Sequence, residues 1–243
     1  MKVGSLFSGI GGLDLGLERA GMEIVWQVEN DPFCCKVLKK YWPEVLLLGD
    51  VKEIDFTTLP AVDLICGGFP CQPVSCAGKR KGDADERWLW PEMFRAIREL
   101  RPKFSLLENV PGLLERGLST VLCDLASIWH DAEWETLPAA AFGSPQLRYR
   151  VFIVAYPQGS IENGKVFRQD RIGQPQIKLR DCRSNTRRNY EGLWGLEPKS
   201  RVVRMADGIS LDVDNRLKAL GNAVVPQVAE WIGRRIMEVS YTL

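Results

Sequence analysis

The first twenty residues constrain the fold most, because they change from a strand pattern to a helix pattern across a run of glycines. Residues 2–7 form an apolar, strand-like stretch, and Ser8-Gly9-Ile10-Gly11-Gly12 follows it directly. The apolar positions of the helical pattern after this turn are Leu13, Leu15, Leu17 and Ala20. A glycine turn between a strand and a helix exposes backbone N–H groups to a nucleotide-like ligand. The stretch therefore predicts an α/β unit with a ligand site at the carboxyl end of its strand.

The rest of the chain repeats this alternation of strands and helices. Apolar runs typical of strands cover residues 23–28, 45–48, 62–66, 103–107, 134–142 and 149–156. Helical patterns cover residues 32–42, 88–100 and 113–129 and the stretch that begins at Pro226. This pattern predicts an open α/β sheet, in which ligands bind outside the carboxyl ends of the strands.

The loop after residues 62–66 carries a cysteine between two prolines. It reads Gly67-Gly-Phe-Pro-Cys71-Gln-Pro-Val-Ser75. The glycines let the backbone approach a bound molecule, and the prolines stiffen the loop. A thiol presented at the carboxyl end of a strand is a candidate nucleophile. The alternative is a buried cysteine without chemical function.

Acidic side chains stand at the ends of other strands. Glu29 lies about 20 residues after the first glycine, where an acid accepts ribose hydroxyls in nucleotide-binding folds. The alternative for Glu29 is a surface acid at a strand end. Asp14 occupies the third glycine position of Gly-x-Gly-x-x-Gly, so a nicotinamide or flavin cofactor is not expected. Glu108 ends another strand, and an acid and a thiol at the same edge can converge on one pocket.

Several classes of protein find little support in the composition. The single histidine, His130, follows a helical pattern and is predicted to lie on the surface, so a Ser/His triad is not expected. The seven cysteines show no Cys-x-x-Cys pair and no Cys/His cluster, so neither disulfides nor zinc are expected. The start lacks a signal-peptide pattern and no apolar run is long enough for a membrane span, which predicts a cytoplasmic protein.

Residues 157–208 differ from the rest of the chain. Their periodicity disappears, and eleven Lys and Arg residues face six Asp and Glu residues, although the whole chain carries a net charge of only +1. A basic segment on a faintly acidic body predicts an irregular or small β insert that contacts a polyanion. A solvated basic loop is the alternative.

Six motifs in order make the chain resemble the cytosine-5 DNA methyltransferase family. They are Phe7-x-Gly9-x-Gly11-Gly12, the acidic strand ends at Glu29 and Asp50, Pro70-Cys71-Gln72 with Ser75, Glu108-Asn109-Val110, Gln146-x-Arg148-x-Arg150, and Gly221-Asn222-Ala223-Val224-x-Pro226. The resemblance implies a Rossmann-like class I methyltransferase sheet with helices on both faces and a small irregular or β insert. It divides the chain into a catalytic and cofactor-binding domain (1–156), a short target-recognition insert (157–208) and a C-terminal segment (209–243). In this family the C-terminal helix packs beside the first glycine turn.

The resemblance also implies an activity and a site. It predicts methyl transfer from S-adenosylmethionine to C5 of a flipped-out cytosine in double-stranded DNA, through a covalent bond between Cys71 and C6. The implied catalytic residues are Cys71, Glu108, Arg148 and Arg150. The implied cofactor-binding residues are Phe7, Gly9, Ile10, Gly11, Gly12, Glu29, Asn30, Asp50, Val51, Pro70, Asn222, Ala223 and Val224. Gln72, Ser75 and Gln146 would contact the DNA, and a monomer without metal, of the restriction-modification type, is expected.

The chain departs from the family in size. Two alternatives stay open, and a third is not supported by the sequence. An insert of about 50 residues is short for target recognition, so residues 77–83 would share that task as a flap over the site. The transfer-RNA branch of the family has Cys-Phe-Thr where this chain has Cys182 followed by Arg183. A DNA-binding regulator with an inactive catalytic domain is a second alternative, which the retained Cys71 and Glu108 oppose. An adenine or N4-cytosine methyltransferase would need Asn/Asp-Pro-Pro-aromatic, which Asp31-Pro32-Phe33-Cys34 does not match.

Overall fold

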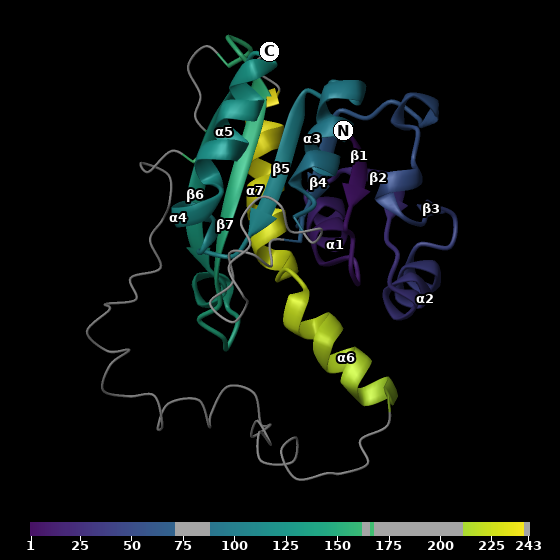
Figure 1. The fold of residues 1–243 in the computed structure, drawn as a ribbon. Helices are drawn as coiled ribbons and strands as arrows, with labels where there is room; N and C mark the ends of the chain where they lie inside the picture. Colours follow the sequence, from purple (N-terminus) through teal and green to yellow (C-terminus); the bar gives the residue numbers. More distant parts are fainter. Residues whose placement is uncertain (71–87, 162–165, 168–210, 241–243) are drawn as a thin grey trace, which may run out of the picture.

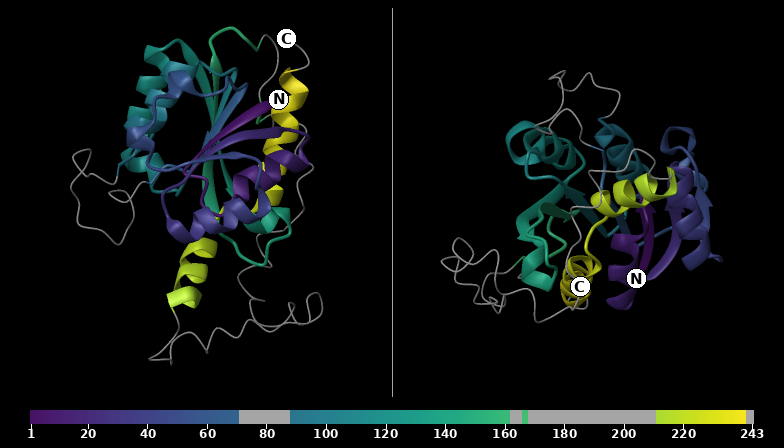
Figure 2. Two further views of the ribbon diagram at one scale, coloured as in Figure 1. Left: turned by 90° about the vertical axis from the view of Figure 1, so that its right-hand side faces the viewer. Right: turned by 90° about the horizontal axis from the view of Figure 1, so that it is seen from below.

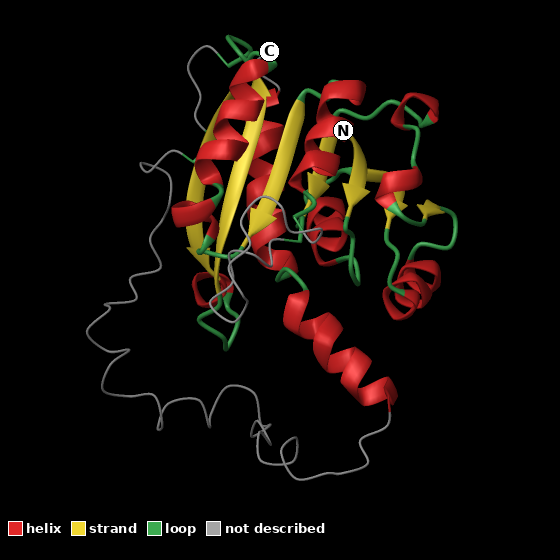
Figure 3. Cartoon of the chain, viewed as in Figure 1, coloured by secondary structure: helices red, strands yellow, loops and turns green. Residues whose placement is uncertain are grey.

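A seven-stranded sheet runs through the molecule, with helices on both of its faces (Figures 1 and 3). The computed structural model describes residues 1–70, 88–161, 166–167 and 211–240. In sequence order the strands are β1 (Lys2–Leu6), β2 (Glu23–Val28), β3 (Leu46–Leu48), β4 (Leu64–Gly67), β5 (Phe104–Asn109), β6 (His130–Pro138) and β7 (Tyr149–Pro157). Their order across the sheet is β3-β2-β1-β4-β5-β7-β6. The strands from β3 to β5 are parallel, and β7 is antiparallel to both β5 and β6.

The helices expected from the sequence pattern are present, although some begin or end at other residues, and a further helix over 211–222 was not predicted. They are α1 (Gly12–Arg19), α2 (Pro32–Tyr41), α3 (Trp90–Leu100), α4 (Leu113–Arg116), α5 (Leu118–Ser127), α6 (Leu211–Asn222) and α7 (Pro226–Ser240). Short 3-10 turns are η1 (Val51–Glu53), η2 (Phe56–Thr58) and η5 (Ala139–Phe142). Pro226 opens α7, as its fixed φ favours.

Two boundaries were predicted wrongly. The single helix expected over 113–129 is divided at Gly117, where the ring of Trp88 packs so closely that a Cβ would lie 2.7 Å from it. The strand expected over 134–142 begins at His130 and ends at Pro138, because its pairing with β7 runs from His130 to Pro138 and the chain then turns into η5. His130 is therefore a strand residue, half-buried, with Nδ1 3.0 Å from the carbonyl oxygen of Ile128.

Each face of the sheet carries its own apolar core. On one face, Leu6, Ile65 and Leu107 pack with α3 and α5. On the other face, alternate strand residues such as Val3, Leu64 and Leu106 pack with α1 and α7, as the two-residue period of a strand requires. The first turned view shows these two helix layers on opposite sides of the sheet (Figure 2). The fold is thus a three-layer α/β arrangement, and the predicted Rossmann-like sheet is confirmed.

Helix α7 returns from the end of the chain to the first βα unit. Three glycines let α7 and the segment before it approach α1 closely: a Cβ on Gly12 would lie 2.4 Å from the Val224 oxygen, and one on Gly16 would lie 2.4 Å from the Cβ of Ala229. Gly233 on α7 faces Ala20 in the same way. The packing of the C-terminal helix beside the glycine turn, which the family resemblance implied, is therefore present.

The predicted domain division stays a prediction, since most of residues 157–208 lie outside the described ranges. Val166 and Phe167, which are described, lie against the sheet. Glu133 on β6 accepts hydrogen bonds from both of their backbone N–H groups at 3.1 and 3.3 Å, and from the Tyr156 hydroxyl at 2.7 Å. In the part of the chain that the structure describes, no helix combines the length and the apolar character needed to cross a membrane.

Candidate active site

A cavity of about 520 Å³ opens at the carboxyl edge of the parallel strands. The chain leaves β1 and β4 in opposite directions along the sheet, so their carboxyl ends form the crevice in which α/β folds bind ligands. Its lining residues at the strand ends are Phe7–Gly9 for β1, Glu29–Asp31 for β2, Gly49 and Val51 for β3, Gly68–Pro70 for β4, and Glu108–Val110 for β5. Gly12, Leu13, Val28, Cys34, Leu89, Arg150, Asn215, Ala219 and Asn222–Val224 complete the lining.

The glycine turn shapes one wall of this cavity through its backbone. Gly9 has a φ of 56° and Gly11 a φ of 81°, values that favour glycine. Phe7 also has a positive φ, 53°, which is strained for an aromatic residue and is found most often at functional sites. The turn therefore leaves open space beside Gly9, where an added Cβ would meet no atom within 4 Å.

Glu29 lies at the end of β2 and holds the glycine turn in place. Its Oε2 accepts a hydrogen bond from the backbone N–H of Gly9 at 2.7 Å. Its Oε1 accepts from the backbone N–H groups of Asn30 and Asp31 at 2.9 and 2.8 Å. The carboxylate predicted to receive a ribose thus lines the cavity and joins the ends of β1 and β2.

The segment after β3 also contributes to the lining of the cavity. Asp50 accepts the backbone N–H of Lys52 at 3.0 Å and so begins η1. Gly49 and Val51 line the cavity, whereas Asp50 itself is not among the lining residues. Val51 is buried, with an exposed fraction of 5%.

Glu108 is the buried acid at the floor of the cavity. Its Oε1 lies 2.9 Å from Nε of Arg150. The register explains this pair: Glu108 stands opposite Phe152 on antiparallel β7, and Arg150 precedes Phe152 by two residues on the same face. A Cβ on Gly68 would lie 2.7 Å from Oε2, so a glycine at that position leaves room for the carboxyl. Burial raises the pKa of Glu108 to about 7, although the charges of Arg150 and Arg148 oppose the shift.

The two arginines of the Gln-x-Arg-x-Arg motif lie in different backbone settings. Arg150 belongs to β7, but Arg148 precedes the strand and has a φ of 20°. Nη1 of Arg148 donates to the Gly221 oxygen in α6, one residue before Asn222. Burial and the neighbouring Arg150 lower the pKa of Arg148 from its ordinary value. Arg148 therefore connects the arginine motif to the Gly-Asn-Ala-Val motif, and Arg150 connects it to Glu108.

Most of the predicted site residues that the structure describes line one cavity. Phe7, Gly9, Gly12, Glu29, Asn30, Val51, Pro70, Glu108, Arg150, Asn222, Ala223 and Val224 do so, whereas Ile10, Gly11, Asp50, Gln146 and Arg148 do not. Gln146 is exposed, and Gly11 packs under the ring of Trp42. Cys71, Gln72 and Ser75, like the flap at 77–83, lie outside the described residues.

Asn109 is a site residue that the sequence reasoning missed. It lines the cavity and is buried, with 4% exposure. Its Nδ2 donates to the Phe69 oxygen at 3.0 Å, and its Oδ1 accepts the Val110 N–H at 2.9 Å. Asn109 thereby ties the end of β5 to the chain just before Pro70-Cys71. Its position in the Glu-Asn-Val motif was the available signal.

The strand order and the cavity at the switch point define a Rossmann-like methyltransferase fold. A solved structure described as a DNA modification methyltransferase encoded within a prophage of Escherichia coli is 31% identical, with a TM-score of 0.55, over 65% of this chain and 47% of that chain. The Dnmt2 methyltransferase of S. pombe, at 22% identity and a TM-score of 0.54 over 72% and 57% of the two chains, shares the fold.

The chain belongs to the C-5 cytosine-specific DNA methylase family, which matches residues 1–205, so the membership expected from the motifs is confirmed. The type II methyltransferase M.Eco47II of Escherichia coli is 43% identical over 158 residues, 62% of this chain and 38% of the relative. M.NgoMIV of Neisseria gonorrhoeae is 40% identical over 61% of this chain and 49% of its own length. The chain thus spans less than half of the length of these two relatives. M.AquIA of Picosynechococcus is 36% identical over 63% of this chain and 71% of its own length.

Proposed function

We propose that this chain transfers a methyl group from S-adenosylmethionine to C5 of a cytosine flipped out of double-stranded DNA. The observation that carries the proposal is Glu108, a buried acid whose pKa is raised to about 7, on the floor of the cavity that the glycine turn and Glu29 also line. A carboxyl that holds a proton near neutrality can protonate a ring nitrogen at the moment a nucleophile adds to the ring. Family membership supplies the class of reaction.

The cavity suits the proposed cofactor in size and in chemistry. Its volume lies within the usual range for small-molecule sites, and the space beside Gly9 admits a ligand next to the backbone. Glu29 would hold the ribose hydroxyls, Val51 would lie on the adenine, and Asn222 would contact the methionine end. S-adenosylmethionine supplies an electrophilic methyl group on a sulfonium. The residues of the chain bind it, orient it and exclude water from it.

The reaction on the base assigns separate tasks to four side chains. The Cys71 thiolate adds to C6 of the cytosine, which makes C5 nucleophilic. Glu108 gives its proton to N3, where the electrons of the addition accumulate. Arg150, held beside Glu108 at 2.9 Å, is placed to bind the cytosine O2, and Arg148 a nearby phosphate. After methyl transfer, N3 returns its proton to the Glu108 carboxylate. A water molecule takes the proton from C5 as the Cys71–C6 bond breaks, and this elimination of the thiolate restores the ring.

The substrate we propose is duplex DNA, because the family acts on DNA and the insert at 157–208 is rich in arginine. A stacked base cannot reach a cavity at the edge of the sheet, so it must be flipped out. Arginines of the insert would contact phosphates. Since relatives in the family are named type II methyltransferases, a role in restriction-modification is proposed. That the chain acts in the cytoplasm and as a monomer is part of the same proposal.

The covalent step can be tested with a duplex that contains 5-fluorocytosine. The fluorine blocks the loss of the C5 substituent, so the protein with cofactor should form an adduct that survives denaturing electrophoresis. Cys71→Ala should form no adduct and no methylcytosine, and it should bind S-adenosylhomocysteine as the wild type does. Cys123→Ala, which removes an exposed thiol elsewhere, serves as the matched control and should react normally. Methylation by Cys71→Ala would refute the mechanism.

Bisulfite sequencing of DNA from cells that express the chain tests the activity itself and reports the target sequence. The proposed function predicts protected cytosines in one short sequence context. Protection of a transfer RNA and not of DNA would favour the transfer-RNA branch. Retention on DNA without methylation of either nucleic acid would favour an inactive regulator.

A further inference from the structure

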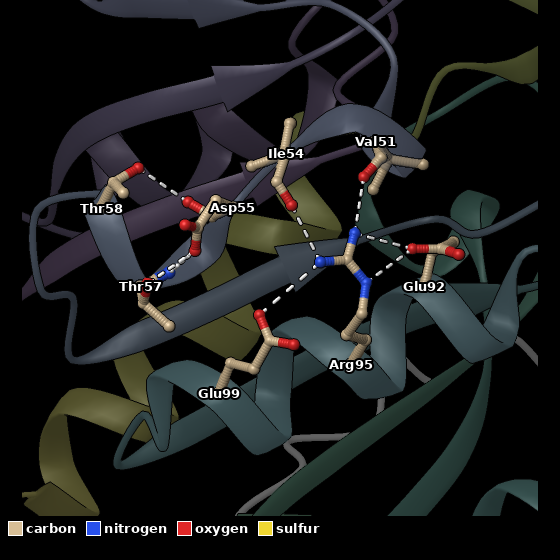
Figure 4. Close-up of polar contacts among 8 residues, drawn as sticks. All are labelled: Val51, Ile54, Asp55, Thr57, Thr58, Glu92, Arg95 and Glu99. Carbon is tan, nitrogen blue, oxygen red and sulfur yellow. Dashed lines mark hydrogen bonds and ion pairs between the residues drawn. The ribbon is translucent and has the colours of Figure 1, made fainter.

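Arg95 on α3 grips the backbone that follows β3 (Figure 4). Its Nη2 donates to the Val51 oxygen and its Nη1 to the Ile54 oxygen, both at 2.8 Å. These residues are 44 and 41 positions away in sequence, so the contacts join two separate parts of the fold. The fork of the guanidinium reaches both carbonyls at once, which a lysine ammonium on its flexible stem does not reproduce.

The Arg95 side chain is itself held from several sides. Its Nε donates to Glu92 Oε2 at 2.8 Å, and Glu99 Oε2 lies 3.6 Å from its Nη1. The guanidinium carbon lies 4.6 Å from the centre of the Phe56 ring, a cation–π distance. The side chain is only 24% exposed. The fixed guanidinium therefore connects α3 to η1 through its hydrogen bonds.

The segment that Arg95 contacts forms part of the cavity and follows a short strand. Strand β3 is three residues long and lies at the edge of the sheet, and in the part of the chain that the structure describes it pairs with β2 alone. Beyond it, Gly49 and Val51 line the cavity, and Asp50 begins η1. Arg95 is not a lining residue of the cavity, yet it hydrogen-bonds the carbonyl of Val51, which is one.

We propose that Arg95 is a positioning residue for the adenine end of the cofactor. Through the carbonyls of Val51 and Ile54 it sets the Asp50–Val51 backbone, so that Val51 lies against the adenine face and Asp50 can accept the adenine amino group. This inference rests on the proposed function, because it needs an adenosyl cofactor in the cavity. Arg95 would thus affect cofactor binding without touching the cofactor itself.

Binding of two ligands to the full chain separates positioning from general stability. S-adenosylhomocysteine carries the adenine amino group, and its hypoxanthine counterpart, S-inosylhomocysteine, carries an oxygen there. Arg95→Ala should weaken the binding of S-adenosylhomocysteine by about tenfold, the size expected when a group that supports a binding residue is lost. It should weaken the binding of S-inosylhomocysteine much less, so the preference for the adenine ligand should become smaller. Titration calorimetry measures the dissociation constants of both ligands.

The controls use the same helix and the same site. Arg98→Ala removes an exposed arginine one turn along α3 and should change neither constant. Arg95→Lys keeps the charge and loses the fork, so its loss of adenine preference should be partial; if Arg95→Ala fails to fold, this variant decides. In an Asp50→Ala background, which has lost the contact to the amino group, Arg95→Lys should have no further effect on the preference.

Two results would overturn different claims. If the Arg95 variants weaken both ligands equally, or leave both unchanged, Arg95 is a structural residue and the positioning inference is wrong. If the wild type binds neither ligand, the proposed function fails first, and the inference fails with it.

Discussion

Glu108 shows how one residue acquires a reactive state from its surroundings. A carboxyl this close to Arg150 would ordinarily ionise more readily, because an opposite charge favours the carboxylate. Here burial has the larger effect, and the pKa of Glu108 rises to about 7. The acid can therefore hold a proton at neutral pH and still sit beside a cation that stabilises the charge it leaves behind. This balance suits a group that must release one proton within each catalytic cycle.

The pH dependence of methylation should follow Glu108. A raised pKa means that the acid is protonated below about pH 7, so the rate should fall as pH rises through that value. Glu108→Gln should lower the rate by about 100-fold or more and should lack this falling limb. Single-turnover rates at several pH values measure both effects. Glu115→Gln, an exposed acid on α4, is the control, and a wild-type rate that keeps rising well above pH 7 would contradict the assignment.

Asn109 provides a second prediction at this scale. Asn109→Ala removes the hydrogen bond to the Phe69 oxygen, two residues before Cys71, so the thiol should be placed less accurately. A misplacement of about 1 Å can cost about 100-fold in rate. Adduct formation with 5-fluorocytosine DNA should slow strongly, and binding of S-adenosylhomocysteine should stay within about twofold. Ser127→Ala, which also breaks a side-chain hydrogen bond but at an exposed site, should leave the adduct rate unchanged.

At the scale of elements, the contact between α1 and α7 connects the two ends of the chain at the cavity. Gly16 and Gly12 remove the side chains that would otherwise keep α7 and Val224 away from α1. The cavity wall formed by Asn222 to Val224 is thereby held beside the glycine turn. Close packing of α1 and α7 is thus a condition for the site, although neither helix is catalytic.

Gly16→Ala tests this coupling between packing and the site. The new Cβ would lie 2.4 Å from both the Ala229 Cβ and the Pro226 oxygen, so α7 must shift. We expect a loss of about 1–3 kcal/mol in the free energy of unfolding, partly offset by the higher helix propensity of alanine, and weaker cofactor binding. The Cβ of Gly233→Ala would approach Ala20 at 2.9 Å, farther along the same interface. This variant should therefore lose less unfolding free energy and less cofactor affinity. Urea titration and calorimetry compare them.

At the scale of the whole molecule, a second buried acid ties stability to pH. Asp14 lies in the first turn of α1, fully buried near Ser5 and Gln27. Burial raises its pKa to about 7. The folded protein therefore binds this proton more tightly than the unfolded chain does, and the stability that results is complete below about pH 4 and is lost as pH rises toward 7.

Asp14→Asn should flatten the dependence of global stability on pH. Between the ordinary pKa of Asp14 and about 7, the wild type should lose up to about 4 kcal/mol more of its unfolding free energy than the variant does. A smaller dependence of stability on pH should persist in the variant, since the pKa of Glu108 is also raised. Urea unfolding at several pH values measures these slopes. Glu23→Gln, at an exposed position at the start of β2, should behave as the wild type, and parallel curves for Asp14→Asn would show the assignment to be wrong.

Much of this architecture could be predicted because the periodicity of the chain is strong. The alternation of apolar runs indicated the parallel strands and most helices, and short motifs placed Glu29, Asn222 and Glu108 at one edge. The broken helix at Gly117 could not be predicted, because the ring of Trp88 that fills the gap comes from a distant segment. The roles of Arg95 and Asn109 could not be predicted for the same reason, because their hydrogen-bond partners lie about 40 residues away in the sequence.

The sequence alone determined the succession of strands, turns and most helices along the chain, and the family. These depend on local pattern and on residue types at fixed spacing. Tertiary structure decided which groups meet. The antiparallel direction of β7 brings Arg150 to Glu108, and the return of α7 places Val224 at the glycine turn. It also decided the ionisation of Glu108 and Asp14, because burial and neighbouring charge are properties of the assembled core and are absent from the sequence.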